Sequence, residues 1–429
     1  MRKVIGLDFG TTNSAVAVAT PDGEAVLATF PEDGRRTATF RSVLYFDPEH
    51  LEPTGRPRAV CGPEAIERYL EADTRGRLIQ SMKSHLASPL FKHTVIFNHS
   101  YTLEELIALF VRELKAAAEA QFGELGTSVV VGRPAHFSGA AETAADDFAL
   151  SRLRAAIEQG GFAHVEFELE PVAAAYQYEQ QLDHDELVLI ADFGGGTSDF
   201  SLIQLGPAAR RRGHRQDDIL GTDGVAIAGD TFDSSFIRHL VAPRLGSGSQ
   251  YQSLFDRVLP VPLWLYEHLE RWHHLSFLKT RETMELLRQI RFRALEPEKI
   301  DAFIHVIEWD LGYQLSRAVE RTKCLLSEQD TSPFTFHDPP VDIREQVRRE
   351  AFESWIGPDL QAIADCVDRL LARCGVSPGD VDSVFLTGGS SFVPAVRHLF
   401  GQRFGAARLR GGGELTTVAK GLALRALAR

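Results

Sequence analysis

The tripeptide Asp-Phe-Gly occurs twice in this chain, each time at the tip of the same strand–turn–strand pattern. The first unit occupies residues 2–19, with a polar turn at 8–13, and the second occupies residues 187–205, with its turn at 192–197. Short apolar runs on both sides of a Gly- and Thr-containing turn predict β-hairpins. Because the flanking strands and a following threonine recur as well, the repeat favours two related lobes over a chance pair of tripeptides.

Strand patterns alternate with helical patterns along the rest of the chain. Apolar strands are predicted at Ser128–Val131 and Val384–Thr387. Helical periodicity predicts helices at Leu103–Phe122, Ala140–Gln159, Pro171–Gln181, Arg344–Gly357, Asp359–Cys374 and Thr416–Ala428. The segment Gly206–Gly213, with three consecutive arginines, is predicted to be an exposed loop. This alternation is typical of the α/β class.

Composition limits the classes of function. The chain has 429 residues and a formal net charge of −13, which argues against a broad nucleic-acid-binding surface. No apolar run approaches the length of a membrane span, and the N-terminal apolar stretch is interrupted by Asp8, so neither a membrane segment nor a secretory signal is predicted. The four cysteines are scattered without a Cys-x-x-Cys pair, which predicts small core residues in a reducing, cytoplasmic compartment. They are Cys61, Cys324, Cys366 and Cys374.

The two hairpin tips carry residue types that suit a polyphosphate. The sequence has neither a G-x-x-x-x-G-K-[ST] loop nor a G-x-G-x-x-G after a strand, so two common phosphate-binding folds have no support. Glycine at a tip lets backbone N–H groups approach phosphate oxygens, and threonine adds hydroxyl donors. Carboxylates at the same tips suit Mg²⁺ or its water ligands. Two such tips facing each other would clamp a nucleotide, although each tip alone is also compatible with an ordinary Asx-type turn.

These hairpins, with further segments in the same order along the chain, resemble the nucleotide-binding domain of the seventy-kilodalton heat-shock chaperones. The segments that carry the resemblance are Gly6–Ser14, Ser128–Pro134, Glu170–Ala175, Asp192–Asp199, the set Glu320, Lys323 and Ser327, and Gly388-Gly389-Ser390 with Val393-Pro394. The resemblance implies a two-lobed actin-like ATPase fold, built from ribonuclease H-like lobes with a nucleotide cleft between them. Lobe I is expected at 1–183, with an irregular subdomain at about 40–100 and a closing helix at 410–429. Lobe II is expected at 184–409, with a helical, aromatic subdomain at about 229–327.

The resemblance also implies slow hydrolysis of ATP to ADP and phosphate. Asp8 and Asp192 would hold Mg²⁺ through water, and Lys83 would reach the γ-phosphate, although a solvent-facing lysine is the alternative there. Glu170 would orient the attacking water or the shell of the metal, a role compatible with its favourable place before a helix N-terminus. Asp199 would position a water or a monovalent cation such as K⁺. The expected catalytic residues are Lys83, Glu170, Asp192, Thr197 and Asp199. The expected nucleotide contacts are Gly10, Thr11, Thr12, Asn13, Gly194, Gly195, Gly196, Glu320, Lys323, Ser327, Gly388, Gly389, Ser390 and Phe392.

The chain departs from the family at three places. Phe392 stands where the family has an arginine that stacks on adenine, and the stretch 412–415 replaces an Asn-Pro-acidic motif. The stretch 244–310 is divergent and aromatic. The chain also ends at the last helix of the nucleotide-binding domain, so it resembles the YegD-type members, which consist of that domain alone.

Two other functions compete with an ATP-hydrolysing chaperone-like protein. One is a small-molecule kinase of the same superfamily, which would need a polar acceptor pocket with a general base, and the sequence offers no clear one. The other is a non-hydrolysing, nucleotide-gated module in which the aromatic segment Leu263–Trp309 binds a client or co-chaperone.

Overall fold

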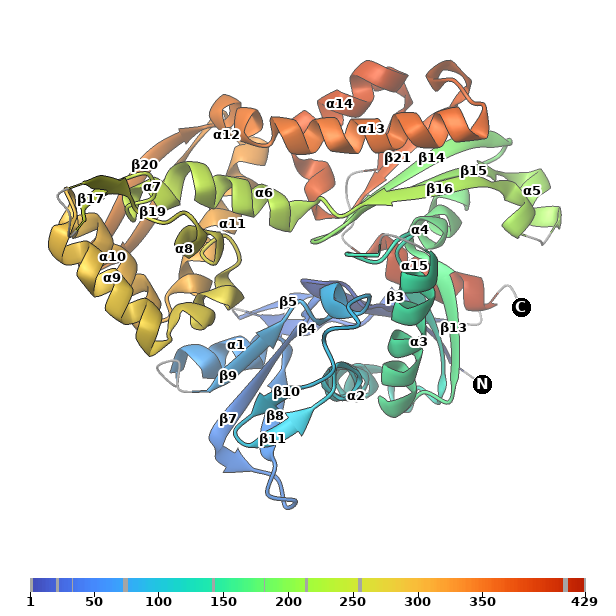
Figure 1. Cartoon of the computed structure of the whole chain (residues 1–429). Coiled ribbons are helices and arrows are strands. Elements are labelled where there is room, and N and C mark those ends of the chain that lie inside the picture. Colours follow the sequence, from blue (N-terminus) through green and yellow to red (C-terminus); the bar gives the residue numbers. More distant parts are fainter. Residues whose placement is uncertain are drawn as a thin grey trace. The chain divides into compact units, whose positions relative to one another are not determined.

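The computed structural model describes residues 3–20, 23–32, 34–71, 76–140, 143–180, 182–212, 215–253, 257–411 and 416–427. The chain forms two compact units (Figure 1). We call Met1–Gly229 together with Gln361–Arg429 the large unit, and Asp230–Leu360 the small unit. Each is described by itself below.

The large unit contains two sheets that are built alike. The strands of the first sheet, in spatial order, are β13 (His164–Leu169), β12 (Ser128–Arg133), β1 (Val4–Asp8), β2 (Asn13–Ala19) and β3 (Ala25–Leu27). The strands of the second sheet, in spatial order, are β22 (Leu409–Gly411), β21 (Ser383–Thr387), β14 (Glu186–Phe193), β15 (Ser198–Leu205) and β16 (Ile219–Val225). In each sheet the first three strands run parallel and the last two continue as antiparallel neighbours. The repeat seen in the two Asp-Phe-Gly hairpins therefore extends to whole sheets.

Helices cover both sheets. They are α2 (Leu103–Phe122) and α3 (Thr143–Gln159) in the first half, and α13 (Gly357–Cys374) and α14 (Pro394–Phe404) in the second. Thr102 caps α2: its side chain accepts from the Glu105 N–H, while the Glu105 carboxylate accepts from the Thr102 N–H. This reciprocal capping box satisfies donors that a helix start leaves free, so α2 begins where the sequence predicted.

Helices α4 (Glu170–Glu179) and α15 (Thr417–Leu427) tie the halves of the large unit together. They contact each other, and each packs on the sheet of the other half: α4 on β14 and β15, α15 on β1 and β2 (Figure 1). Alanines of β2 and α15 form this contact on the first sheet. A Cβ on Gly6 would lie 2.4 Å from backbone atoms of Ala419 and Ala423, so only small residues fit on this face.

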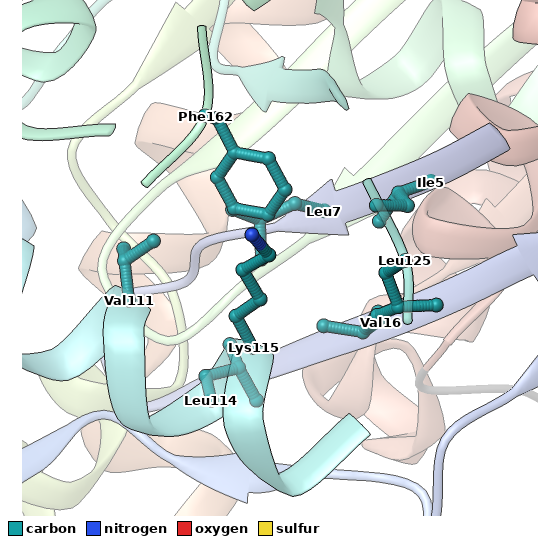
Figure 2. Close-up of a pocket in the computed structure, with 8 residues that line it drawn as sticks. All are labelled: Ile5, Leu7, Val16, Val111, Leu114, Lys115, Leu125 and Phe162. Atoms are coloured by element: carbon teal, nitrogen blue, oxygen red, sulfur yellow. The ribbon is translucent and has the colours of Figure 1, made fainter. Parts of the chain in front are cut away.

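The opposite face of the first sheet carries bulky side chains that pack under α2. A small apolar cavity remains there, lined by Ile5, Leu7, Val16, Val111, Leu114, Lys115, Leu125 and Phe162 (Figure 2). The Lys115 ammonium lies 5.0 Å from the centre of the Phe162 ring and donates to the Gly161 carbonyl. The lining is otherwise hydrocarbon, so this cavity is a packing gap in the core.

The segment between β3 and α2 adds one short strand to the first sheet, β6 (Phe40–Arg41) beside β2, and forms further small sheets. Its elements are β4 (Phe30–Glu32), β5 (Arg35–Thr37), β6 (Phe40–Arg41), β7 (Val43–Leu51), β8 (Pro57–Cys61), α1 (Gly62–Glu71), β9 (Arg77–Gln80), η1 (Met82–His85), β10 (Thr94–Ile96) and β11 (His99–Tyr101). The region predicted as irregular at 40–100 thus contains a three-stranded sheet, β8-β7-β9, and the β10–β11 hairpin. Further short elements of the large unit are α5 (Pro207–Arg212), η2 (Arg215–Asp218), η5 (Pro378–Asp380), η6 (Gly389–Phe392) and η7 (Ala406–Arg408).

The small unit is mainly helical, with two hairpins. Its elements are α6 (Gly229–Phe236), η3 (Ile237–Val241), α7 (Ala242–Arg244), β17 (Gln250–Gln252), β18 (Val258–Pro260), α8 (Trp264–Glu267), η4 (Trp272–Leu278), α9 (Arg281–Arg293), α10 (Pro297–Glu308), α11 (Gly312–Glu328), β19 (Thr331–Asp338), β20 (Val341–Arg348) and α12 (Arg349–Trp355). A fully buried cluster of rings lies around Phe236, whose ring centre is 5.5 Å from that of Phe334.

Three local predictions need correction. The helix predicted from Arg344 begins at Arg349, because residues 341–348 alternate between buried and exposed positions as strand β20. The segment predicted as an exposed loop contains the short helix α5. Of the four cysteines, Cys61 and Cys366 are buried, but Cys324 is exposed. Among the helices that the structure describes, none is both long and apolar enough to cross a membrane.

Candidate functional site

The tips of the two Asp-Phe-Gly hairpins lie against each other within the large unit. A Cβ on Gly196 would lie 3.2 Å from the Thr11 hydroxyl oxygen, closer than most Cβ contacts in proteins. The second tip is closed by a bond from the Gly194 N–H to the Thr197 carbonyl, 2.9 Å. In the first tip, the Thr12 carbonyl accepts from the Ser42 N–H at 2.9 Å. The structure therefore brings together glycines and threonines that lie far apart in the sequence.

The carboxylates of the site differ between the two hairpins. Asp192 and Asp199 lie directly opposite each other on the antiparallel strands β14 and β15, and both are buried. Asp8, the last residue of β1, lies opposite Ala15 at the corresponding position of the first hairpin. Two like charges opposite each other on neighbouring strands destabilise a sheet. Their presence here indicates a function for the pair.

Lys83 and Glu170 form a buried ion pair. The Lys83 Nζ atom lies 2.6 Å from Glu170 Oε1, and the two residues are 8% and 6% exposed. Lys83 comes from η1, and Glu170 is the first residue of α4, where the N-terminal end of a helix favours a carboxylate. The solvent-facing alternative for Lys83 is thus wrong, because its ammonium is buried against a carboxylate.

Asp199 is fixed by a backbone donor that the sequence did not reveal. The Ala135 N–H, just beyond the end of β12, donates to Asp199 Oδ1 at 2.7 Å. Thr197 adds a side-chain hydrogen bond to the same carboxylate. No side-chain pattern could have pointed to Ala135, because the interaction uses only its main chain.

Burial raises the pKa of all three aspartates. The pKa of Asp8 rises to about 7, because burial disfavours its charge and the Glu170 carboxylate repels it, while Lys83 opposes the rise. The pKa of Asp199 also rises to about 7 through burial and Glu170, against the hydrogen bonds from Thr197 and Ala135. Burial, followed by Glu170 and the other two aspartates, holds the pKa of Asp192 well above its usual range.

The cluster carries more negative than positive charge. Burial lowers the pKa of Lys83, but Glu170 and Asp8 outweigh burial, so this pKa is raised and the ammonium is retained at neutral pH. Among the described side chains that act on the three aspartates, Lys83 is the cation. With Lys83 paired to Glu170, the aspartates form an oxygen-rich site that favours an added cation.

The described residues contain no set of three or more His, Cys, Asp or Glu side chains arranged to ligate a metal directly. Carboxylate oxygens are a donor type that suits Mg²⁺ or its water ligands. The role expected of Asp8 and Asp192 toward Mg²⁺ stays a prediction.

The predicted adenosine contacts lie in two places. On α11 of the small unit, Glu320 accepts from Arg317 at 2.9 Å, and Lys323 is paired with Asp233 at 2.7 Å. The Ser327 hydroxyl donates to the Lys323 carbonyl at 3.2 Å. The spacing of the three predicted residues along one helix, at i, i+3 and i+7, gives them a shared face.

The remaining predicted contacts lie in the large unit, directly after β21. Gly388 has a φ of 82°, which favours glycine, and it leads into η6. Ser390 is buried, whereas Phe392 is 39% exposed. The strand β21 runs parallel to β14, with Thr387 opposite Asp192, so Gly388 and Gly389 follow the strand next to the acidic pair. The joint role of η6 and α11 in one adenosine site stays a prediction, and the stretch 412–415 lies outside the described residues.

Comparison with known proteins is consistent with this geometry. The chain matches the family model described as Hsp70 protein over residues 4–246 and 306–428. It is 26% identical over 444 aligned positions to the chaperone protein DnaK from each of two strains of Thermus thermophilus. Each alignment covers 99% of this chain and 61% of the relative, so the chain spans about three fifths of the length of these curated relatives. Residues 247–305, which the family model does not match, fall within the stretch predicted to be divergent.

Proposed function

The chain belongs to the Hsp70 protein family, and from this premise we propose that it binds ATP with Mg²⁺ and hydrolyses it to ADP and phosphate. The family has the actin-like ATPase fold, so the predicted fold class is confirmed. Its members are ATPases that bind client proteins and co-chaperones. The division into lobes at residues 183 and 184 stays a prediction.

The observation that carries this proposal is the convergence of a buried ammonium and four carboxylates beside the two hairpin tips. The Gly194 N–H is taken up by the Thr197 carbonyl, so the backbone N–H groups of Gly195 and Gly196, with the hydroxyls of Thr11 and Thr12, would donate to phosphate oxygens. Burial and repulsion from Glu170 raise the pKa of Asp8 and of Asp199, so a positive charge beside their carboxylates would be favourable. A hydrated Mg²⁺ bound to the phosphates would supply that charge.

The residues of the chain then divide the work of hydrolysis. The oxygen of a water bonds to the γ-phosphorus, the bond to the bridging oxygen breaks, and ADP leaves with that electron pair. Lys83 would offset negative charge on the transferring phosphoryl group. Glu170 would orient the water through its free lone pairs. Asp199, whose carboxylate is held by the Ala135 N–H and by Thr197, would accept the proton that the water loses.

Phosphate release from ATP tests the proposal, with ATP affinity measured in parallel by calorimetry. Lys83→Ala and Asp192→Asn are expected to lower turnover at least about 100-fold, with ATP still bound by at least one of them. Lys92→Ala is the matched control, because Lys92 is an exposed lysine of the same segment. Turnover that survives both variants would contradict the assignment of this site.

A non-hydrolysing, nucleotide-gated binding module is the second candidate. It is favoured by the exposed apolar side chains of the small unit, several of which lie in the stretch that the family model leaves unmatched. They are Val258, Leu259, Leu263, Trp264, Phe277, Phe292, Leu295 and Trp309. A wild type that binds ATP but releases no phosphate would select this candidate. The YegD-type assignment, a nucleotide-binding domain that acts alone, a client or co-chaperone as partner, K⁺ binding and a cytoplasmic location stay predictions.

A further inference from the structure

Arg152 is a buried arginine for which the proposed mechanism has no role. It lies on α3, is 6% exposed, and its guanidinium donates to both oxygens of Glu104, at 2.5 and 3.4 Å. Its other donors point at main-chain carbonyls. The acceptors are the carbonyls of His85 at 3.4 Å, Leu86 at 3.4 Å, Ser88 at 3.2 Å and Phe91 at 3.1 Å.

All four carbonyls belong to the segment that follows Lys83. Lys83 is the second residue of η1, which ends at His85, and the chain then runs without a strand until β10. Leu86 is buried, the other three residues are partly buried, and the His85 carbonyl also accepts from the Ser88 N–H at 3.1 Å. Carbonyls shielded from water outside regular structure need donors from elsewhere. The planar guanidinium of an arginine carries several N–H donors in a fixed geometry. It can therefore donate to several carbonyls at once, which the flexible ammonium of a lysine cannot reproduce.

The backbone before Lys83 also needs support from its surroundings. Ser81 has a φ of 55°, a left-handed conformation that is strained for a residue other than glycine. Met82 and Leu86 are buried and anchor the segment to the core of the first sheet. These two apolar side chains hold the segment against the core, but they leave it able to rotate about its own axis. Hydrogen bonds to its carbonyls restrict that rotation.

We propose that Arg152 is a positioning residue that holds the segment 82–91 so that the Lys83 ammonium meets Glu170 and the phosphate-binding tips. The proposal rests on the proposed function of Lys83. The hydrogen bonds described for Arg152 go to Glu104 and to the segment 82–91, so its effect on hydrolysis passes through the backbone that carries Lys83.

Arg154, which is exposed, provides a control two residues along the same helix. Its Nη1 atom donates to the Val165 carbonyl at 2.7 Å, and its guanidinium lies 4.9 Å from the centre of the Phe167 ring. These contacts fasten β13 to α3, whereas those of Arg152 reach the segment 82–91. Arg154 is exposed whereas Arg152 is buried, so Arg154→Lys controls for the exchange of one cation for another on α3 and for the loss of a main-chain hydrogen bond. The amide hydrogen-exchange rates of residues 82–91 report positioning itself.

The first experiment compares Arg152→Lys and Arg154→Lys by phosphate release and by calorimetric ATP binding. Lysine keeps a positive charge beside Glu104, so Arg152→Lys is expected to fold. Its turnover is expected to fall about tenfold, because small displacements of a catalytic group are costly, while ATP affinity changes less than about twofold. Arg154→Lys is expected to leave both quantities unchanged. Equal turnover in the two variants would overturn the proposal.

Amide hydrogen exchange separates this proposal from the proposed function. The amides of residues 82–91 are expected to exchange faster in Arg152→Lys than in wild type. In Arg154→Lys their exchange rates are expected to equal those of wild type. If wild type shows no turnover, the proposed function fails, and faster exchange confined to Arg152→Lys still supports positioning. Exchange of this segment that is the same in both variants and wild type contradicts it.

Discussion

The first and second sheets of the large unit share strand order and direction, yet they carry different charges at the same place. In the hairpin of the first sheet, Asp8 faces Ala15; in the hairpin of the second, Asp192 faces Asp199. The two scaffolds are equivalent, so the difference lies in one side chain. The duplicated hairpins thus carry one carboxylate at this place in the first sheet and two in the second.

The insertions of the two halves differ in a related way. The segment between β3 and α2 carries Lys83, whose ammonium lies in the site of the large unit. The segment between β16 and α13 forms the small unit, which carries Glu320, Lys323 and Ser327. The same position in the repeat therefore supplies the buried Lys83 in one half and the predicted adenosine helix in the other.

The largest expected effect comes from making the second hairpin like the first. Asp199→Ala is expected to lower turnover about 100-fold or more, because it removes the proposed proton acceptor, while ATP binding is retained. The measurement is phosphate release under single-turnover conditions. A turnover equal to that of wild type would show that ATP hydrolysis does not depend on the second carboxylate of this hairpin.

The reciprocal change, Ala15→Asp, is expected to destabilise the protein by about 3 kcal/mol. It buries a second carboxylate opposite Asp8, beside small residues that contact α15. The unfolding midpoint in urea measures this loss. A stability equal to that of wild type would mean that the first hairpin tolerates the arrangement of the second.

The glycines of the two tips give a smaller, graded effect. In Gly10→Ala, the new Cβ would lie 2.1 Å from the Asn13 carbonyl oxygen, so the first tip must change shape. In Gly196→Ala, the Cβ meets Thr11 at 3.2 Å, a contact that a small shift relieves. ATP affinity, measured by calorimetry, is expected to fall about 30-fold and about fivefold, respectively.

Gly379→Ala is the control for both, since its nearest neighbour would be 3.8 Å away. The ranking of the two tip variants is the test. A larger loss of affinity in Gly196→Ala than in Gly10→Ala contradicts the account of the two tips.

The nucleotide-free protein is expected to become more stable as pH falls from 8 to 5. Asp8 and Asp199 have folded pKa values of about 7, against an ordinary value of 3.8, so the folded state binds protons in this window and the unfolded state does not. Protons therefore favour folding, by at most about 2–3 kcal/mol for each group over the window. Thermal unfolding at several pH values checks this, and Asp199→Asn is expected to flatten the dependence. If stability depends on pH in the same way in wild type and in Asp199→Asn, protonation of Asp199 does not contribute to that dependence.

An effect as small as that of Gly196→Ala is expected at Phe392. Its exposed ring is expected to stack on adenine, so Phe392→Ala should weaken ATP binding about fivefold. Phe392→Arg should restore most of that loss, because a guanidinium also stacks on an aromatic base. Calorimetric titration with ATP measures both. Affinities unchanged in Phe392→Ala would exclude a stacking role.

The sequence predicted the elements of the site better than their contacts. The bounds of α2 and β15 follow directly from periodicity and from the Thr102–Glu105 capping pattern, which are local signals. Strand β20 was predicted as part of a helix, because its charged exposed positions resemble the helix that begins at Arg349. The local sequence pattern of residues 344–348 favours a helix, but hydrogen bonding to β19 makes this segment a strand.

Contacts between distant residues were beyond sequence reasoning. Lys83 and Glu170 were each predicted, but their ion pair joins residues 87 positions apart. Arg152 gave no signal, because an arginine on an amphipathic helix ordinarily faces solvent, and only the fold shows it turned inward. The donor from Ala135 depends on where β12 ends, which no side chain encodes.

The number of protons released when Mg²⁺ and ADP bind at pH 7 tests the central claim most directly. Titration calorimetry in buffers of different ionisation enthalpy gives this number. A cation–nucleotide pair at the carboxylates should drive Asp8 and Asp199 fully to their charged forms, releasing about one proton more than the nucleotide alone accounts for, and about half as much in Asp199→Asn. Equal proton release by wild type and Asp199→Asn would contradict the placement of the nucleotide at these buried carboxylates.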